Sequence, residues 1–119
     1  MTAHLQDDVA QCIKSYVATS PLNRLTHIDG APMWDEPLVG FADGDDPLFQ
    51  LYKTVVGTDH LTPRQALAAS HSTGEPPAHV SVVSWILPTA EQTRRSNVDM
   101  RNGPSLRWNH TRFEGEAFN

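Results

Sequence analysis

The apolar positions of residues 3–18 recur at intervals of three, four and one along the chain. This spacing is typical of a helix with one apolar face. Cys12 belongs to that face, so we expect a buried structural thiol rather than a reactive one, which would need an exposed, electropositive setting. Ser20 and Pro21 should end the helix, because a residue before proline avoids helical backbone angles.

Capping residues predict two further helices in the middle of the chain. Asp46 is a suitable N-cap, and Pro47 a suitable first residue, for a helix that ends at Gly57. A third helix should begin where Thr62 is followed three residues later by a glutamine, the spacing of a capping box. We expect this helix to reach about His71.

Two more helices are predicted toward the C-terminus. Thr89 should begin a polar helix, because Gln92 lies three residues further on. Residues 102–104 (NGP) should end it, and Ser105 is the expected cap of a last helix. The apolar side chains of that last segment are Leu106, Trp108, Phe113 and Phe118.

Residues 80–87 (VSVVSWIL) carry the strongest strand pattern in the chain. They are rich in β-branched and aromatic residues and apolar on both faces, which is typical of a strand covered on both sides. Trp85 should therefore lie in the core, and residues 37–42 predict a second, short buried strand. The predicted fold class is mixed α/β, with four to five helices around a small sheet whose central, buried strand lies at about 80–87.

Length and composition fit one domain over residues 1–119. No run of apolar residues reaches the roughly 18 that a membrane span needs, and the acidic N-terminus lacks the apolar stretch of a signal peptide. We therefore expect a cytoplasmic protein that does not bind membranes. A formal net charge of −5 argues against nucleic acid as a general partner.

The cysteine and histidine content predicts no metal site. With one cysteine, Cys12, the chain cannot form an internal disulfide or supply the thiolates of an iron–sulfur cluster. No two histidines have the i,i+4 spacing of a zinc-binding helix. His71 and His79 flank a loop and leave a weaker alternative, a metal hydrolase. We otherwise assign no metal ligands.

The arginines suggest a place for an anionic ligand. Residues 93–97 (TRRSN) follow the strand 80–87 closely, and ligands of open α/β sheets bind beyond the carboxyl ends of strands. Guanidinium groups there can hold phosphate or carboxylate through two hydrogen bonds, although a solvated helix face with local ion pairs is the alternative. The candidate cofactor-binding residues are Ser84, Arg94, Arg95, Asn97 and Arg107.

A resemblance to a known family rests on five segments. They are residues 21–25 (PLNRL), 35–49 (DEPLVGFADGDDPLF), 60–64 (HLTPR), 80–88 (VSVVSWILP) and 93–97 (TRRSN). Together they resemble the N-terminal half of the iron–sulfur proteins related to epoxyqueuosine reductase. The resemblance covers about residues 20–119, and its most specific segment is 35–49.

The resemblance implies redox chemistry. Longer members of the family carry a ferredoxin-like domain with two 4Fe–4S clusters, and the epoxyqueuosine reductases use a corrinoid to reduce a modified tRNA base. It therefore implies that residues 1–119 are the N-terminal part of a larger redox protein. In the relatives an acidic residue after an arginine–aromatic segment donates a proton, and here that residue would be Glu114.

Two functions remain open from the sequence. The first is an oxidoreductase-like domain that is catalytically incomplete alone, binds no cofactor by itself, and depends on 4Fe–4S clusters and a corrinoid in a longer chain or a partner. The second is a non-catalytic binding or assembly module that docks on a cluster-bearing partner, or on its own copy, through the apolar face of the last helix.

Overall fold

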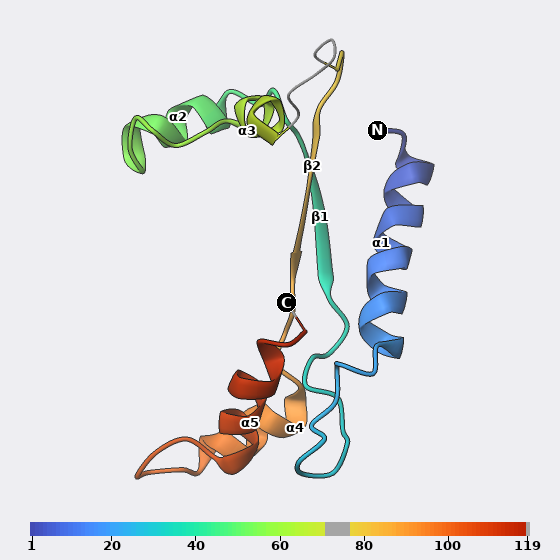
Figure 1. Cartoon of the computed structure of the whole chain (residues 1–119), viewed down its shortest axis with the longest axis vertical. Coiled ribbons are helices and arrows are strands. Elements are labelled where there is room, and N and C mark those ends of the chain that lie inside the picture. Colours follow the sequence, from blue (N-terminus) through green and yellow to red (C-terminus); the bar gives the residue numbers. More distant parts are fainter. Residues whose placement is uncertain (71–76, 119) are drawn as a thin grey trace. The chain divides into compact units, whose positions relative to one another are not determined.

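A computed structural model describes residues 1–70 and 77–118 of the chain. The described residues form five helices and a two-stranded antiparallel sheet, which confirms the predicted mixed α/β class (Figure 1). In chain order the elements are α1 (Ala3–Thr19), β1 (Leu38–Asp43), α2 (Leu48–Val55), α3 (Pro63–Ser70), β2 (Ser81–Ile86), α4 (Glu91–Val98) and α5 (Leu106–Gly115).

The chain divides into two compact units. The first unit comprises Met1 and Gly40–Ser84, and the second comprises Thr2–Val39 and Trp85–Asn119. The first unit therefore holds α2 and α3, the second holds α1, α4 and α5, and the division falls within both strands. A single domain over residues 1–119 stays a prediction.

In the first unit, the predicted caps define both helices. The Asp46 carboxylate accepts a hydrogen bond of 2.9 Å from the Leu48 N–H at the start of α2, and Gly57 follows the helix with a positive φ of 151°. Thr62 and Gln65 form the predicted capping box, with reciprocal hydrogen bonds of 3.0 and 3.3 Å. The structure describes α3 to Ser70, whereas His71 lies outside the described residues.

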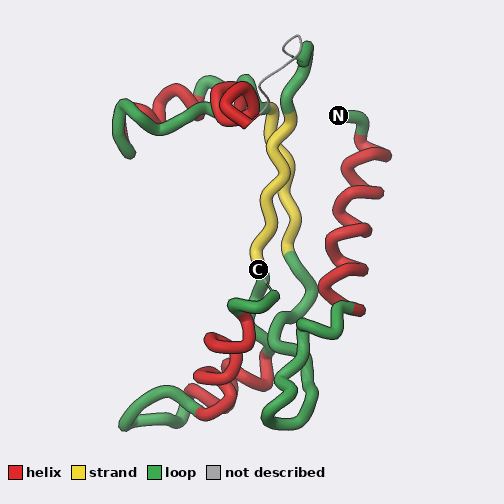
Figure 2. The backbone as a smooth tube through the Cα atoms, in the orientation of Figure 1, coloured by secondary structure: helices red, strands yellow, loops and turns green. Residues whose placement is uncertain are grey.

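The sheet differs from the predicted one in its burial. Strands β1 and β2 pair only with each other among the described residues, so the strand predicted at 80–87 is not a central one (Figure 2). Trp85 is 55% exposed and Ile86 is also exposed, so the prediction of a buried strand with Trp85 in the core was wrong. An apolar sequence favours burial, but it does not supply the layers that would cover both faces. The predicted burial of residues 37–42 fails in the same way, because the residues of β1 are exposed or half-buried.

Gly44 follows β1 at a point of close backbone approach. Its N–H donates a hydrogen bond of 2.7 Å to the Val80 carbonyl. A Cβ at this position would lie 2.8 Å from the same carbonyl oxygen, closer than real contacts allow. A glycine is therefore required where the chain leaves the first strand.

Asn23 organises the core of the second unit. Its side chain is buried and accepts hydrogen bonds from the Met33 and Trp34 N–H groups at 3.0 and 2.9 Å. Its amide nitrogen donates to the carbonyls of Val17 and Trp34 at 2.9 and 3.2 Å. One side chain thus replaces the regular backbone pairing that the loop before β1 lacks. The buried apolar side chains of this unit are Val17, Leu25, Met33 and Ala90, with Pro37 also buried.

Helix α4 begins two residues after the predicted start at Thr89. Thr89 instead forms an antiparallel bridge with Trp34, which continues the pairing beyond the strands. The first N–H of α4, that of Glu91, donates to the Asp35 carboxylate at 3.0 Å. A side chain far away in the sequence therefore performs the capping that had been assigned to Thr89.

Helix α5 begins as predicted and packs against α4. The Ser105 hydroxyl accepts a hydrogen bond of 3.1 Å from the Trp108 N–H, which is an N-cap. At the other end of the helix, a Cβ on Gly115 would lie 2.9 Å from the Trp34 ring. The absence of a side chain at Gly115 therefore allows the Trp34 indole to approach the helix backbone.

Helix α1 spans the predicted residues, but Cys12 is exposed rather than buried. The buried residue of this helix is Val17, near its C-terminal end. The helix was therefore predicted correctly, whereas the predicted burial of Cys12 was wrong, because no element covers the helix at this position among the described residues. No helix in the described part of the chain combines the length and the apolar character needed to cross a bilayer.

Candidate functional site

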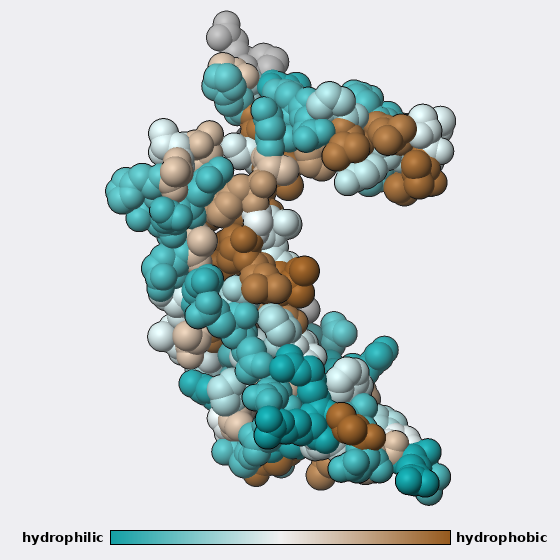
Figure 3. All heavy atoms as spheres, turned by 180° about the vertical axis from the view of Figure 1, so that it is seen from behind, coloured by the Kyte–Doolittle hydropathy of each residue, from teal (hydrophilic) through white to brown (hydrophobic). Residues whose placement is uncertain are grey.

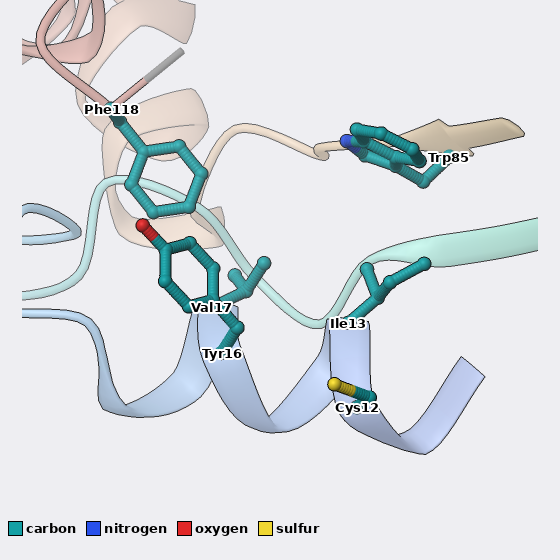
Figure 4. Close-up of a pocket in the computed structure, with 6 residues that line it drawn as sticks. All are labelled: Cys12, Ile13, Tyr16, Val17, Trp85 and Phe118. Carbon is teal, nitrogen blue, oxygen red and sulfur yellow. The ribbon is translucent and has the colours of Figure 1, made fainter. Parts of the chain in front are cut away.

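An apolar pocket lies in the second unit beside α1. It encloses about 330 Å³ and is lined by Cys12, Ile13, Tyr16, Val17, Trp85 and Phe118. Figure 4 shows the Phe118 ring beside that of Tyr16, with Trp85 across the pocket from Ile13. The rings of Tyr16 and Phe118 are tilted by 43°, with centroids 5.9 Å apart.

The side chains of this pocket favour a flat, mostly apolar ligand. Its aromatic walls offer stacking surfaces, and the polar groups of its lining side chains are the Cys12 thiol, the Tyr16 hydroxyl and the Trp85 indole N–H. The sequence analysis assigned both Cys12 and Trp85 to the core. The structure instead exposes the two side chains and places them on the same pocket.

A polar cluster around Glu114 lies in the same unit. His110 and Glu114 are one turn apart on α5, and the loop after α1 contributes Thr26 and His27. The Oε1 atom of Glu114 lies 3.0 Å from His110 Nδ1 and 3.1 Å from His27 Nδ1. Its Oε2 atom accepts hydrogen bonds of 2.9 Å from the Thr26 N–H and from the Thr26 hydroxyl.

These contacts set the protonation state of Glu114. Burial raises the pKa of this carboxyl group, but the hydrogen bonds from Thr26, His27 and His110 outweigh it and lower the pKa from 4.5 to about 2. Glu114 is therefore ionised at neutral pH and accepts hydrogen bonds. The role of proton donor that the family resemblance implies for Glu114 stays a prediction.

Three of the predicted anion-binding residues on α4 have partners within the chain. Arg94 donates to the Thr89 carbonyl at 2.7 Å, and Arg95 pairs with Glu91 one turn earlier at 2.6 Å. The Asn97 side-chain oxygen accepts a hydrogen bond of 2.8 Å from the N–H of Ser105, the residue that caps α5. The contacts of all three are made to α4 itself or to neighbouring segments, and an anion-binding role for these residues stays a prediction.

Arg107 and Ser84 lie in different surroundings. Arg107 is mostly buried and forms an ion pair of 2.7 Å with Asp29, with a second hydrogen bond of 3.1 Å to Gln92. Its guanidinium holds the pKa of Asp29 below the usual value. Ser84 is exposed and belongs to the first unit, whereas the other four candidates belong to the second.

The structure reveals a set of possible metal ligands that the sequence analysis did not find. One ligand atom from each of His27, His110 and Glu114 lies within 4.8 Å of the others. His110 and Glu114 have the i,i+4 spacing of a metal-binding helix, a signal that a search for pairs of histidines does not detect. Nothing in the local sequence of His27 indicates that it meets them. The alternative pair His71 and His79 includes a residue outside the described part of the chain.

Comparisons of the chain with protein-family models, with curated proteins and with solved structures found no match.

Proposed function

We propose that this chain is an oxidoreductase-like domain of an iron–sulfur protein related to epoxyqueuosine reductase, and that it is catalytically incomplete alone. The resemblance of residues 35–49 and of the four shorter segments supports the family. The observation that carries the proposal is the aromatic-walled pocket beside Trp85, since a redox cofactor with a flat ring system needs such a surface.

The number of cysteines decides whether this chain can hold the iron–sulfur clusters itself. One cysteine cannot ligate a 4Fe–4S cluster, which takes four thiolates, so electrons must come from clusters in a longer chain or in a partner. The role of this chain is then to bind and orient the electron acceptor. The exposed aromatic pocket changes the expectation that the chain binds no cofactor by itself: we propose that the ring of a corrinoid lies against this surface. We propose the cytoplasm as the location, where a lone thiol such as Cys12 stays reduced.

Tryptophan fluorescence tests this proposal. Hydroxocobalamin titrated into the full chain is expected to quench the fluorescence to saturation, because the corrin ring would lie against the Trp85 indole. Trp85→Phe should remove most of the saturable quenching, whereas Trp108→Phe, which changes a tryptophan outside the pocket, should retain it. Equal quenching in both variants, or none in the parent chain, would contradict the proposal.

Reconstitution of iron–sulfur clusters tests the proposal that the electrons come from outside this chain. With iron and sulfide added anaerobically, the chain alone should acquire no stable visible absorption band. A two-cluster ferredoxin added as electron donor should then reduce the bound corrinoid. A stable iron–sulfur centre on the chain alone would refute the proposal that the clusters lie in a longer chain or in a partner.

A second candidate is a binding or assembly module without catalysis, and the surface of α2 favours it. None of the residues of this helix is buried, and Figure 3 shows hydrophobic atoms at the surface over this segment. Leu106 and Phe113 on α5, the helix that the sequence predicts as the interface, are exposed as well. Such faces are typical of protein–protein contacts, either with a cluster-bearing partner or with a second copy. Binding of a cluster-bearing partner or of a second copy, with no binding of a corrinoid, would support this candidate over the first.

A further inference from the structure

The Glu114 cluster has the composition of a transition-metal site. Two imidazoles and one carboxylate are the protein ligands of catalytic zinc sites and of non-haem iron(II) sites, in which the remaining positions stay open. In this chain the three ligands come from two segments, His27 from the loop after α1 and His110 with Glu114 from α5. The redox function proposed above rests on the pocket beside Trp85 and not on a metal ion at this cluster.

Two of the three separations between ligand atoms are close to what a metal ion requires, and the third, between the two imidazoles, is at most 4.8 Å. Ligands about 2.0–2.1 Å from a tetrahedral zinc ion lie ~3.3 Å from one another. Glu114 Oε1 lies 3.1 Å from His27 Nδ1 and 3.0 Å from His110 Nδ1, so these two edges need to open only slightly. The stacked rings of His27 and His110, with centroids 5.8 Å apart, turn the same nitrogen toward the carboxylate.

Thr26 holds the carboxylate in place for such an ion. Both its N–H and its hydroxyl donate to Oε2, which leaves Oε1 directed at the two imidazoles. Outer partners of this kind orient the ligands of metal sites. Metal binding would replace the hydrogen bonds from both Nδ1 atoms to the carboxylate, so each neutral imidazole would carry its proton on Nε2 and offer its Nδ1 lone pair to the ion.

We infer that His27, His110 and Glu114 form a binding site for one divalent first-row transition metal, of the class of zinc(II) and iron(II). Hard ions such as Mg²⁺, which prefer a set of oxygen ligands, are excluded by the two imidazoles. The His27 side chain is 71% exposed, so an ion can reach the site from solvent. The Glu114 side chain is 15% exposed and forms the buried side of the site.

Calorimetric titration of the chelator-treated full chain with ZnCl₂ tests the inference. One equivalent should bind, and Co²⁺ should produce the visible absorption of a low-coordinate complex with nitrogen and oxygen ligands. MgCl₂ in the same experiment should produce no binding. In the NMR spectrum, the Nδ1 resonances of both imidazoles should shift on addition of zinc.

Variants separate this site from adventitious binding. His27→Ala removes an exposed ligand without disturbing the core, and it should weaken zinc binding by more than the ~10- to 100-fold loss that follows removal of an outer partner. Thr26→Ala should weaken it within that range. His4→Ala is the matched control, because His4 also faces an acidic residue, Asp8, at i,i+4 but has no third ligand nearby among the described residues.

Two outcomes would overturn the inference. The first is a parent chain that binds less than one equivalent of zinc. The second is zinc affinity that falls in His4→Ala and stays unchanged in His27→Ala. Glu114→Gln is less informative, since it also removes contacts that join α5 to the loop.

Discussion

The ionisation of Glu114 is linked to folding. Its pKa of about 2 in the folded chain is below the ordinary value of 4.5, so the folded state releases this proton more readily than the unfolded state. The resulting stabilisation is fully present above about pH 4.5 and is lost as the pH falls toward 2. We expect the free energy of unfolding, measured by urea titration, to fall over this interval.

Glu114→Gln isolates this contribution. The pKa values of Asp29 and Asp45 are also lowered, by Arg107 and Arg64, and they add a loss of the same sign in acid. The variant should therefore be less stable than the parent chain at neutral pH, and the difference between the two should shrink as the pH approaches 2. A difference that stays constant with pH would contradict the assigned role of the carboxylate.

At the same scale, the fate of single residues shows what a sequence pattern can and cannot determine. The apolar character of Cys12 and Trp85 was evident, but their burial depends on whether other segments cover them, and both are exposed. The bond from Thr26 to Glu114 joins residues 88 positions apart. No local pattern encodes such a meeting, so the Glu114 cluster required the structure.

At the scale of the element, helix boundaries were predicted where the cap is local. Thr62 with Gln65, and Ser105, cap α3 and α5 as their spacing indicates, because these hydrogen bonds connect residues within one turn. The start of α4 was misplaced because its cap, Asp35, is 56 residues distant from Glu91. Caps that arise from tertiary structure have no local spacing to recognise.

The Ser105 cap can be measured directly. Ser105 is buried and its hydroxyl satisfies the Trp108 N–H at 3.1 Å, so Ser105→Ala should lower the free energy of unfolding by about 1 kcal/mol. Thr2→Ala at α1 is the control, because Thr2 is exposed and its capping bond to Leu5 is longer, at 3.4 Å. Urea unfolding followed by circular dichroism should show the smaller loss for Thr2→Ala, and equal losses would count against the cap assignment.

At the scale of the whole molecule, the sequence predicted the mixed α/β class and the position of both strands. It did not predict how little of the two strands is buried by other elements. A sheet of two strands provides little buried area, and such pairs are marginally stable unless another layer packs on them. Among the described residues, large apolar side chains remain exposed in both units. Burial of these side chains against another polypeptide would be energetically favourable.

We therefore predict that the chain self-associates in solution through the exposed face of α2. Val55, at 77% exposure, lies on a helix with no buried residue, so self-association through this face would remove apolar area from water. Light scattering coupled to size exclusion should show a molar mass above that of the 13.2 kDa chain, rising with concentration. Val55→Lys should lower this mass, because a charge at the contact is costly to desolvate.

Val98→Lys, at a position of α4 with 79% exposure, is the matched control and should leave the mass unchanged. A parent chain that is monomeric at all concentrations would show that α2 does not drive self-association, and the face would then be free for a different partner.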